Sequence, residues 1–362
     1  MTSRARPIRV VQWATGTVGK FAIASCRQNE AFELVGCYVH SPEKAGRDAG
    51  EIAGVGPMGV IASNDVDEVL AIDADVVHFA PLLVSIGQLC RILEAGRNLV
   101  TPTGFTTIGD EGVAARIQAA CRKGGVSFHG SGIHPGFSGD RLPLVLSAMS
   151  RRIDRVIVYE VIDMSRINES WDMVRMLGFD MPPETARANP PALLEVMSKV
   201  FFESIALVAQ GLGVEIDRYE KRHEFALAKR DIAIDLELGT KTGTIRQGHV
   251  AGQSFDYRGI VGDDAVIDFR TRWKMGSDLD PDWPFSDPWA YEIVIEGEPP
   301  LRLKFTCGAE DGSDSAAYGL LCTAMNCMNS MPHVVAAAPG VKTQLDLPML
   351  RAVNAFHPGR NA

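Results

Sequence analysis

A glycine-containing turn near the start of the chain limits its fold more than any other feature. The motif WATGTVGK spans residues 13–20 and directly follows the apolar run IRVVQW. From Val18 to Gln28 apolar residues recur at helical spacing, and the segment Phe32–His40, rich in branched and aromatic residues, predicts a second strand. A strand, a glycine turn, a helix and another strand in this order predict a βαβ unit.

The same alternation of short apolar runs and helical segments continues to about residue 131. Further strands are predicted at 59–62, 75–81, 98–102 and 126–130, with helices at 84–95 and 110–123. Parallel strands joined by crossover helices form a doubly wound sheet. We therefore expect an α/β protein with a Rossmann-type dinucleotide-binding domain over residues 1–147.

The pattern changes beyond this point and indicates a second domain. RVIVYEVIDM at 155–164 predicts a strand, and 191–213 predicts a buried helix with proline at its start and glycine at its end. Most of the sequence from 219 to 307 is β-like. We expect an α+β substrate domain over 148–312 with a mixed or antiparallel sheet. A last helix at about 313–331, ended by Pro332, should pack back on the first domain and leave 332–362 as a C-terminal tail.

Charge and composition exclude several classes of partner. Lys and Arg number 36 against 45 Asp and Glu, a net charge of −9 without a basic stripe, which argues against nucleic-acid binding. The apolar run before the glycine turn is too short for a signal peptide or a membrane span, so no membrane partner is expected. The seven cysteines lack paired spacing. They predict thiols in a reducing cytoplasm and no metal site.

The glycine turn predicts where a dinucleotide would bind. In the pattern GxGxxG the second and third glycines are Gly16 and Gly19, whereas Ala14 stands in the place of the first. Their backbone should approach a pyrophosphate at the helix N-terminus. The alternative is a glycine turn without a ligand. The residues expected to contact the cofactor here are Ala14, Thr15, Gly16, Thr17, Val18 and Gly19.

The end of the second strand bears on the choice of cofactor. NAD-selective sites place an acidic residue there to hold the ribose 2'-hydroxyl. This strand instead ends at His40 and Ser41, with Lys44 and Arg47 following. An imidazole, a hydroxyl and cations suit a 2'-phosphate, so NADP is favoured over NAD. The alternative is a loop whose charges only face water.

Other candidate site residues follow later strands. Ala80, Pro81 and Thr103 end two strands, and they should border the nicotinamide because cofactor and substrate meet at the carboxyl edge of such a sheet. The alternative is that each segment is only a strand terminus. His134, in the segment HGSGIHPGF, is a candidate proton donor or substrate ligand; the alternative is a structural histidine bonded to a backbone carbonyl. Asp163, at the end of the strand 155–164, is a candidate for the substrate pocket or only a helix cap.

Four motifs together resemble a known family: WATGTVGK, VHSPEKAGRDAGE, GIHPGF and MNSMPHVVAAAPG. They are similar to those of the dihydrodipicolinate reductase-like oxidoreductases, nearest to the branch of 2,4-diaminopentanoate dehydrogenase and the native amine dehydrogenases. The resemblance implies a Rossmann domain, a substrate domain on a mixed sheet and a homodimer. It also implies reversible NAD(P)-linked chemistry at an amine, imine or carbonyl carbon of a small molecule.

This chain departs from the family at two places. It lacks the HHxxKxD segment of the lysine-pathway reductase, so that activity is not expected. The amine dehydrogenases place a glutamate after the fifth strand, where this chain has Thr103, Gly104 and Phe105. Either Asp163 supplies the carboxylate, or the substrate is a carbonyl or alcohol that needs only a proton donor such as His134. A catalytically silent NADP-binding sensor or scaffold is the alternative function.

Overall fold

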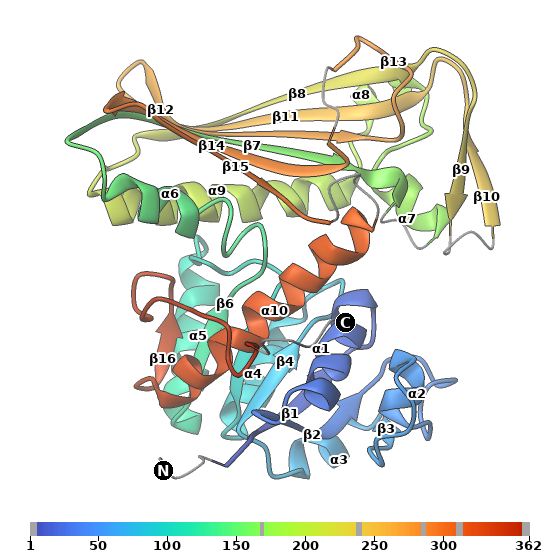
Figure 1. Ribbon diagram of the computed structural model, residues 1–362, viewed down its shortest axis with the longest axis vertical. Helices are drawn as coiled ribbons and strands as arrows, with labels where there is room; N and C mark the ends of the chain where they lie inside the picture. The colour runs from blue at the N-terminus through green and yellow to red at the C-terminus, as the bar shows by residue number, and fades with distance from the viewer. Residues whose placement is uncertain (1–5, 167–169, 237–240, 284–286, 309–313, 357–362) are drawn as a thin grey trace. The chain divides into compact units, whose positions relative to one another are not determined.

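The computed structural model describes residues 6–166, 170–236, 241–283, 287–308 and 314–356 (Figure 1). The chain divides into two compact units. The first comprises Met1–Phe137 and Leu320–Ala362, and the second comprises Ser138–Gly319. Each unit has its own sheet. The boundary predicted from the sequence, between residues 147 and 148, lies ten residues further along the chain.

The first unit is built on a seven-stranded parallel sheet in the order β16-β6-β5-β4-β1-β2-β3. Because β1 lies between β4 and β2, the strand order reverses there, and ligands of such sheets bind at the carboxyl ends of the strands beside that point. The strands are β1 (Ile8–Trp13), β2 (Phe32–Tyr38), β3 (Ala62–Ser63), β4 (Val76–Phe79), β5 (Asn98–Thr101), β6 (Ser127–Gly130) and β16 (Gly340–Lys342).

Helices cover both faces of this sheet, as Figure 1 shows. Neighbouring residues of a strand point to opposite faces, so Val10 packs in one apolar cluster with α1 and α10, and Val11 packs in the other with α4 and α5. The helices are α1 (Thr17–Gln28), α2 (Ala49–Ala53), α3 (Val66–Ala71), α4 (Ile86–Glu94), α5 (Glu111–Gly124) and α10 (Ser315–Ala336), most of which belongs to this unit.

Helix α10 continues past Pro332, where the sequence analysis had ended it. A proline inside a helix removes one backbone donor and costs about 3 kcal/mol. Met331 and Val334, on either side of the proline, are completely buried in the same cluster as Val10. Packing therefore carries the helix to Ala336. Residues 340–342, expected to lie in a tail, form β16 and pair with β6.

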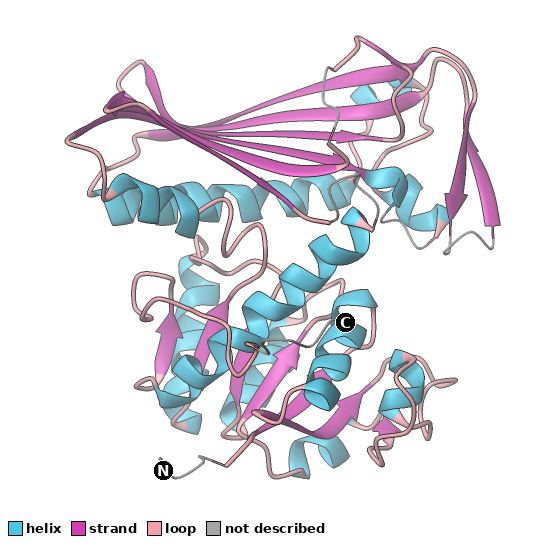
Figure 2. Ribbon diagram, in the orientation of Figure 1, coloured by secondary structure: helices cyan, strands magenta, loops and turns pink. Residues whose placement is uncertain are grey.

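The second unit contains a seven-stranded sheet in the order β13-β8-β11-β12-β7-β14-β15 (Figure 2). Only β7 and β12 pair in parallel, and the other neighbours are antiparallel, so the sheet is mixed. Its strands are β7 (Arg152–Asp163), β8 (Arg218–Ala228), β11 (Val250–Val261), β12 (Asp264–Lys274), β13 (Leu279–Asp280), β14 (Trp289–Glu298) and β15 (Leu301–Thr306). A separate pair is formed by β9 (Ile232–Leu236) and β10 (Lys241–Ile245).

One long helix, α9 (Ala192–Leu212), packs on this sheet. Pro191 precedes it and Gly213, at φ +69°, ends it, as the sequence predicted. Phe201 of α9 stacks on Tyr257 of β11 with ring centroids 4.7 Å apart. The shorter helices of this unit are α6 (Arg141–Ser147), the 3₁₀ turn η1 (Met164–Arg166), α7 (Trp171–Met176) and α8 (Pro183–Ala188).

The predicted fold class is confirmed, with local differences. The strand expected at 59–62 is observed at Ala62–Ser63, and α2 forms where no helix was predicted. The carboxylate of Asp48 accepts hydrogen bonds from four backbone amides between Gly50 and Gly59, so it begins α2 and closes the loop after it. None of the described helices combines the length and hydropathy needed to cross a bilayer.

Candidate functional site

The first position of the glycine motif is filled by an alanine in a glycine-like conformation. Ala14 follows β1 with φ +73°, in the left-handed region that L residues other than glycine rarely adopt. Its backbone N–H donates to the carbonyl of Tyr38 at 2.9 Å, which joins the turn to the end of β2. The sharp turn that the first glycine usually permits is therefore present in this chain, made by an alanine.

Gly16, the second position, begins helix α1 and leaves its amides open. Its φ of −69° is one that any residue can adopt, and no side chain among the described residues caps this helix end. A Cβ added to Gly16 would meet no atom within 4 Å. The first amides of α1 have no partners within the helix, and together with the helix dipole they make a binding site for an anion such as a pyrophosphate.

Gly19, the third position, allows α1 to lie directly against the end of β1. A Cβ there would lie 2.3 Å from the carbonyl oxygen of Ala14 and 2.8 Å from Nε2 of Gln12. Both distances are too short for any real Cβ contact. The three positions thus perform the three tasks of a dinucleotide turn: a sharp bend, an open approach and close packing of helix on strand.

Charged and polar side chains gather at the carboxyl end of β2. Nζ of Lys44 lies 3.3 Å from the hydroxyl of Thr15, so this cation stands beside the glycine turn. The ring of exposed His40 contacts Tyr38 edge-on. The hydroxyl of Ser41 donates to the carboxylate of Glu43, and this hydrogen bond lowers the pKa of Glu43. The sequence analysis overlooked Glu43, whose negative charge opposes that of Lys44.

The residues predicted to border a nicotinamide lie at the same edge of the sheet. Ala80 extends β4, and its N–H donates to the carbonyl of Trp13 at 3.0 Å, beside the glycine turn. Thr103 follows β5, and its hydroxyl lies 2.7 Å from that of Thr101. Buried Pro81 is followed by Leu82 and Leu83, which are both largely exposed. This edge therefore presents apolar side chains next to backbone and hydroxyl groups.

Phe105 lies in the loop after β5, in the segment 103–105 where the family resemblance would place a glutamate. Gly104 and Phe105 both have positive φ, +102° and +63°. The ring of Phe105 packs edge-on against Phe128 of β6, with centroids 5.8 Å apart. A Cβ on Gly130 would lie 2.2 Å from the carbonyl oxygen of Gly104, so this loop depends on a glycine in β6. The segment is closely packed and offers no acid.

His134 lies half-buried in a turn that α10 holds in place. Nδ2 of Asn326, on α10, donates to Oγ of Ser131 at 2.9 Å and to the carbonyls of Gly132 and Gly136 at 2.7 and 3.2 Å. Sequence reasoning missed Asn326, which lies two residues before the late motif MNSMPHVVAAAPG. It is a supporting residue for the segment that carries His134.

Asp163 and His134 belong to different units of the chain. Oδ1 of Asp163 accepts hydrogen bonds from the amide and the hydroxyl of Ser165, at 3.1 and 2.6 Å, and from the amide of Gly276 at 3.4 Å. These bonds fix the turn after β7. They correspond to the capping role that the sequence analysis named as the alternative, and a catalytic role for Asp163 stays a prediction.

The second unit holds a buried carboxylate that the sequence analysis did not select. Glu160 of β7 is only 3% exposed, and it accepts a hydrogen bond from Nε1 of Trp273 at 2.8 Å. Tyr291 of β14 lies opposite Glu160 in the sheet register, and burial, followed by the charge of Glu160, raises the pKa of Tyr291. A charged residue within the apolar run VIVYEVI was the signal available in the sequence.

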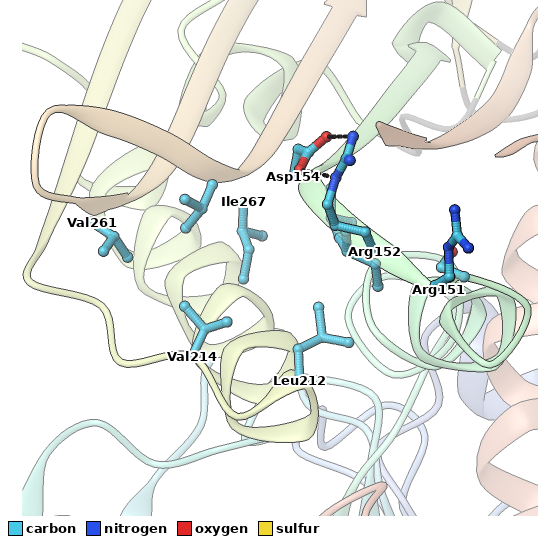
Figure 3. A pocket seen from close by; sticks show the side chains of 11 residues that line it. Arg151, Arg152, Asp154, Leu212, Val214, Val261 and Ile267 are labelled. Atoms are coloured by element: carbon cyan, nitrogen blue, oxygen red, sulfur yellow. Dashed lines mark hydrogen bonds and ion pairs between the residues drawn. The ribbon is translucent and has the colours of Figure 1, made fainter. Parts of the chain in front are cut away.

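A pocket of about 400 Å³ lies at one end of the sheet of the second unit (Figure 3). Leu212, Val261 and Ile267 form part of its apolar wall. Arg152, at its rim, is paired with Asp154 at 2.9 Å, as the dashed lines in Figure 3 show. None of the predicted site residues lines it, so we do not assign the chemistry to this pocket. The described residues contain no group of three or more His, Cys, Asp or Glu placed to hold a metal ion.

Comparisons with known proteins extend the argument from the turn to the whole chain. Residues 137–358 match the model of the 2,4-diaminopentanoate dehydrogenase C-terminal domain, and residues 9–128 match that of the dihydrodipicolinate reductase N-terminus. The amine dehydrogenase of Streptomyces virginiae is 28% identical over 96% of this chain and 98% of its own length. The 2,4-diaminopentanoate dehydrogenase of Acetoanaerobium sticklandii is 22% identical over 67% of this chain and 63% of its own length.

A solved structure, that of an amine dehydrogenase from Mycobacterium smegmatis, has the same fold, with a TM-score of 0.77 and 22% identity over 98% of this chain and 99% of its own. The resemblance stated from the four sequence motifs is confirmed. The chain belongs to the 2,4-diaminopentanoate dehydrogenase family and is an NAD(P)-dependent oxidoreductase.

Proposed function

We propose that this oxidoreductase acts on a small substrate at a carbon that bears an amine or an imine. The full-length similarity to a protein named amine dehydrogenase supports the amine, and the C-terminal family model supports it as well. The observation that carries the reaction type is the open N-terminus of α1, where Gly16 leaves space for a pyrophosphate. The dinucleotide, when bound, supplies or accepts the hydride.

The chain's own residues bind and orient the cofactor and handle the proton. Backbone amides from Thr15 to Gly19 hold the phosphates, and Ala80, Pro81 and Thr103 border the nicotinamide. His134 exchanges the proton with the substrate nitrogen, because imidazole titrates near neutral pH and its turn is held by Asn326. Asp163 is the alternative acid.

A coupled absorbance assay at 340 nm tests this function. NADPH or NADH oxidation is followed over a panel of ketones and aldehydes, each with and without ammonium. A rate that requires ammonium is expected. A rate without ammonium would make the protein a carbonyl reductase, and dinucleotide binding without any rate would support a sensor or scaffold.

Substitutions test the residue that moves the proton. His134→Asn should lower kcat at least tenfold and change the pH dependence of the rate. His333→Asn, a half-buried histidine of α10 in the same unit, is the matched control and should leave both unchanged. If Asp163→Asn instead changes the pH dependence of the rate, Asp163 is the acid and His134 is not.

We further propose that NADP is preferred over NAD, through the 2'-phosphate. Lys44 supports this preference because its ammonium group stands beside Thr15 of the turn. His40 and Ser41 line the same end of β2, whereas the carboxylate of Glu43 opposes a phosphate there. Lys44→Ala should weaken NADPH binding about tenfold with little effect on NADH, and Glu43→Gln should strengthen NADPH binding. Equal effects on both cofactors would contradict the assignment.

A homodimer located in the cytoplasm is also proposed, from the family resemblance. We place the dimer interface on the face of the second unit's sheet that is opposite to α9. Helix α9 packs against the face of the sheet that contains Tyr257. Neighbouring residues of a strand point to opposite faces, so the other face contains Arg155, Asp268 and Arg270. On that face the two arginines pair with Asp268. Light scattering on the purified protein should give twice the chain mass, and a mass of one chain would refute the dimer.

A further inference from the structure

Two polar side chains lie in the interior of the first sheet, directly below the glycine turn. Gln12 of β1 and His78 of β4 are paired in the sheet register, and both are completely buried. A parallel sheet covered on both faces usually carries apolar residues at such positions. Burying an amide and an imidazole is unfavourable unless their hydrogen-bonding groups are engaged, so the contacts of this pair need an explanation.

The pair leads to two backbone carbonyls of the turn. Nε2 of Gln12 donates to the carbonyl of Ala14 at 2.8 Å and to that of Trp13 at 3.3 Å. Oε1 of Gln12 is 2.8 Å from Nδ1 of His78. Because the amide nitrogen of Gln12 faces carbonyl groups, its oxygen is the acceptor, and His78 donates from Nδ1. The ring stays neutral near pH 7, since burial lowers the pKa of His78 to about 4.

The shorter of these two hydrogen bonds holds the carbonyl of Ala14, the residue that makes the sharp bend. Ala14 occupies the left-handed region at φ +73°, which a glycine would adopt without a steric penalty. Gly19 packs against the same carbonyl oxygen. Ala14 is thus held from below by Gln12, and its orientation decides where the following amides of Thr15 and Gly16 point.

We propose that Gln12 and His78 are positioning residues for dinucleotide binding, which hold Ala14 in the conformation that this motif usually obtains from a glycine. The inference rests on the proposed function, because it requires that the turn binds the cofactor. His78 acts through Gln12: its donated hydrogen bond keeps the glutamine amide from rotating. Neither side chain contacts the cofactor.

Rescue by glycine is the decisive experiment. Gln12→Met keeps the side-chain volume and removes the amide, so the binding-competent turn becomes less populated and the Kd for NADPH should rise about tenfold. In Gln12→Met with Ala14→Gly, the glycine adopts the left-handed conformation unaided, and the Kd should return to within about threefold of the wild type. Kd values are measured by quenching of protein fluorescence, with thermal unfolding in parallel.

Two further variants separate positioning from general stability. Gln118→Met removes another glutamine of the same unit, whose Oε1 accepts from the amide of Val341 at 2.9 Å, far along the sheet from the turn. It should lower the unfolding temperature and leave the Kd unchanged. His78→Asn retains a donor near the position of Nδ1 and should bind NADPH like the wild type, whereas His78→Leu should bind it more weakly and should be rescued by Ala14→Gly.

Each outcome decides the question. If Gln12→Met binds as the wild type does, or if Ala14→Gly does not restore binding, the pair does not act through Ala14 and the inference is wrong. If Gln12→Met does not fold, the two His78 variants give the same test, and equal Kd values for Asn and Leu overturn the inference. If the wild type binds neither NADPH nor NADH, the proposed function itself fails and the inference fails with it.

Discussion

Adding one methyl group should weaken dinucleotide binding at Gly16 but lower the stability of the fold at Gly19, although the two residues are three positions apart in one turn. At Gly19 the new Cβ would lie 2.3 Å from the carbonyl oxygen of Ala14, which is backbone and cannot rotate away. Helix α1 must then shift away from β1. Such overpacking costs about 1–3 kcal/mol, equivalent to a fall of roughly 3–10 °C in the unfolding temperature.

At Gly16 the same methyl group meets no atom within 4 Å, and φ is −69°. Replacing a glycine at a compatible site stabilises the fold by about 0.4–1 kcal/mol through the unfolded chain. The weaker capping of a helix by alanine removes a similar amount, roughly 0.5–1 kcal/mol. The stability of Gly16→Ala should therefore stay near that of the wild type. Its methyl group would, however, occupy the approach of the pyrophosphate, so dinucleotide binding should weaken at least tenfold.

Differential scanning fluorimetry and fluorescence titration with NADPH measure the two effects independently. Gly19→Ala should lower the unfolding temperature, and Gly16→Ala should lower affinity without lowering the unfolding temperature. Gly46→Ala is a control in the loop after β2; its φ of +79° predicts a loss of stability through backbone strain alone. If Gly16→Ala binds NADPH as tightly as the wild type, the phosphates do not lie where we place them.

Three further predictions concern polar groups that are buried or partly buried. Burial raises the pKa of Asp48, but hydrogen bonds from four backbone amides more than offset this, so its pKa lies below the ordinary value. The stability that Asp48 contributes is therefore present above about pH 4 and is lost in stronger acid. In Asp48→Asn the urea midpoint should change less between pH 5 and pH 2 than it does in the wild type. Burial lowers the pKa of His78 to about 4. As the pH falls from about 6.5 to 4, the unfolded chain therefore takes up a proton at His78 that the native chain does not. The free energy of unfolding of the wild type should drop by about 3 kcal/mol over that range relative to His78→Asn. Asn326→Ala should release the turn that carries His134 and lower kcat roughly tenfold while the Kd for NADPH stays constant, and equal changes in both would argue against a role confined to that turn.

The architecture was largely predictable because it depends on local periodicity. The run IRVVQW, the helix after it and the alternation that follows specify a parallel sheet, and proline and glycine mark the ends of α9. The predictions that were wrong concern segments whose structure depends on residues far away in the sequence. Pro332 looks like a helix end until Met331 and Val334 are seen to be fully buried. Residues 340–342, which follow that helix, form the strand β16 because they pair with the edge strand β6.

The glycine turn was predictable in position but not in detail. The glycine spacing indicates where α1 begins, and the structure does place Lys44 next to Thr15. That Ala14 performs the part of a glycine follows from its φ value, which no pattern of letters reveals. The role of Gln12 was not predictable, because it depends on a contact with His78, 66 residues further along the chain.

The pairing of β16 with β6 has a consequence for synthesis on the ribosome. The first 137 residues emerge early, yet their sheet keeps a bare edge at β6, and one of its faces lacks α10, until residue 342 has been made. An unpaired strand edge invites association with other chains. The second unit lies entirely within residues 138–319, so its translation is completed before that of the first unit. The unit that contains the glycine turn, although begun first, is thus the last to be completed, and incomplete chains carry an unpaired strand edge at β6.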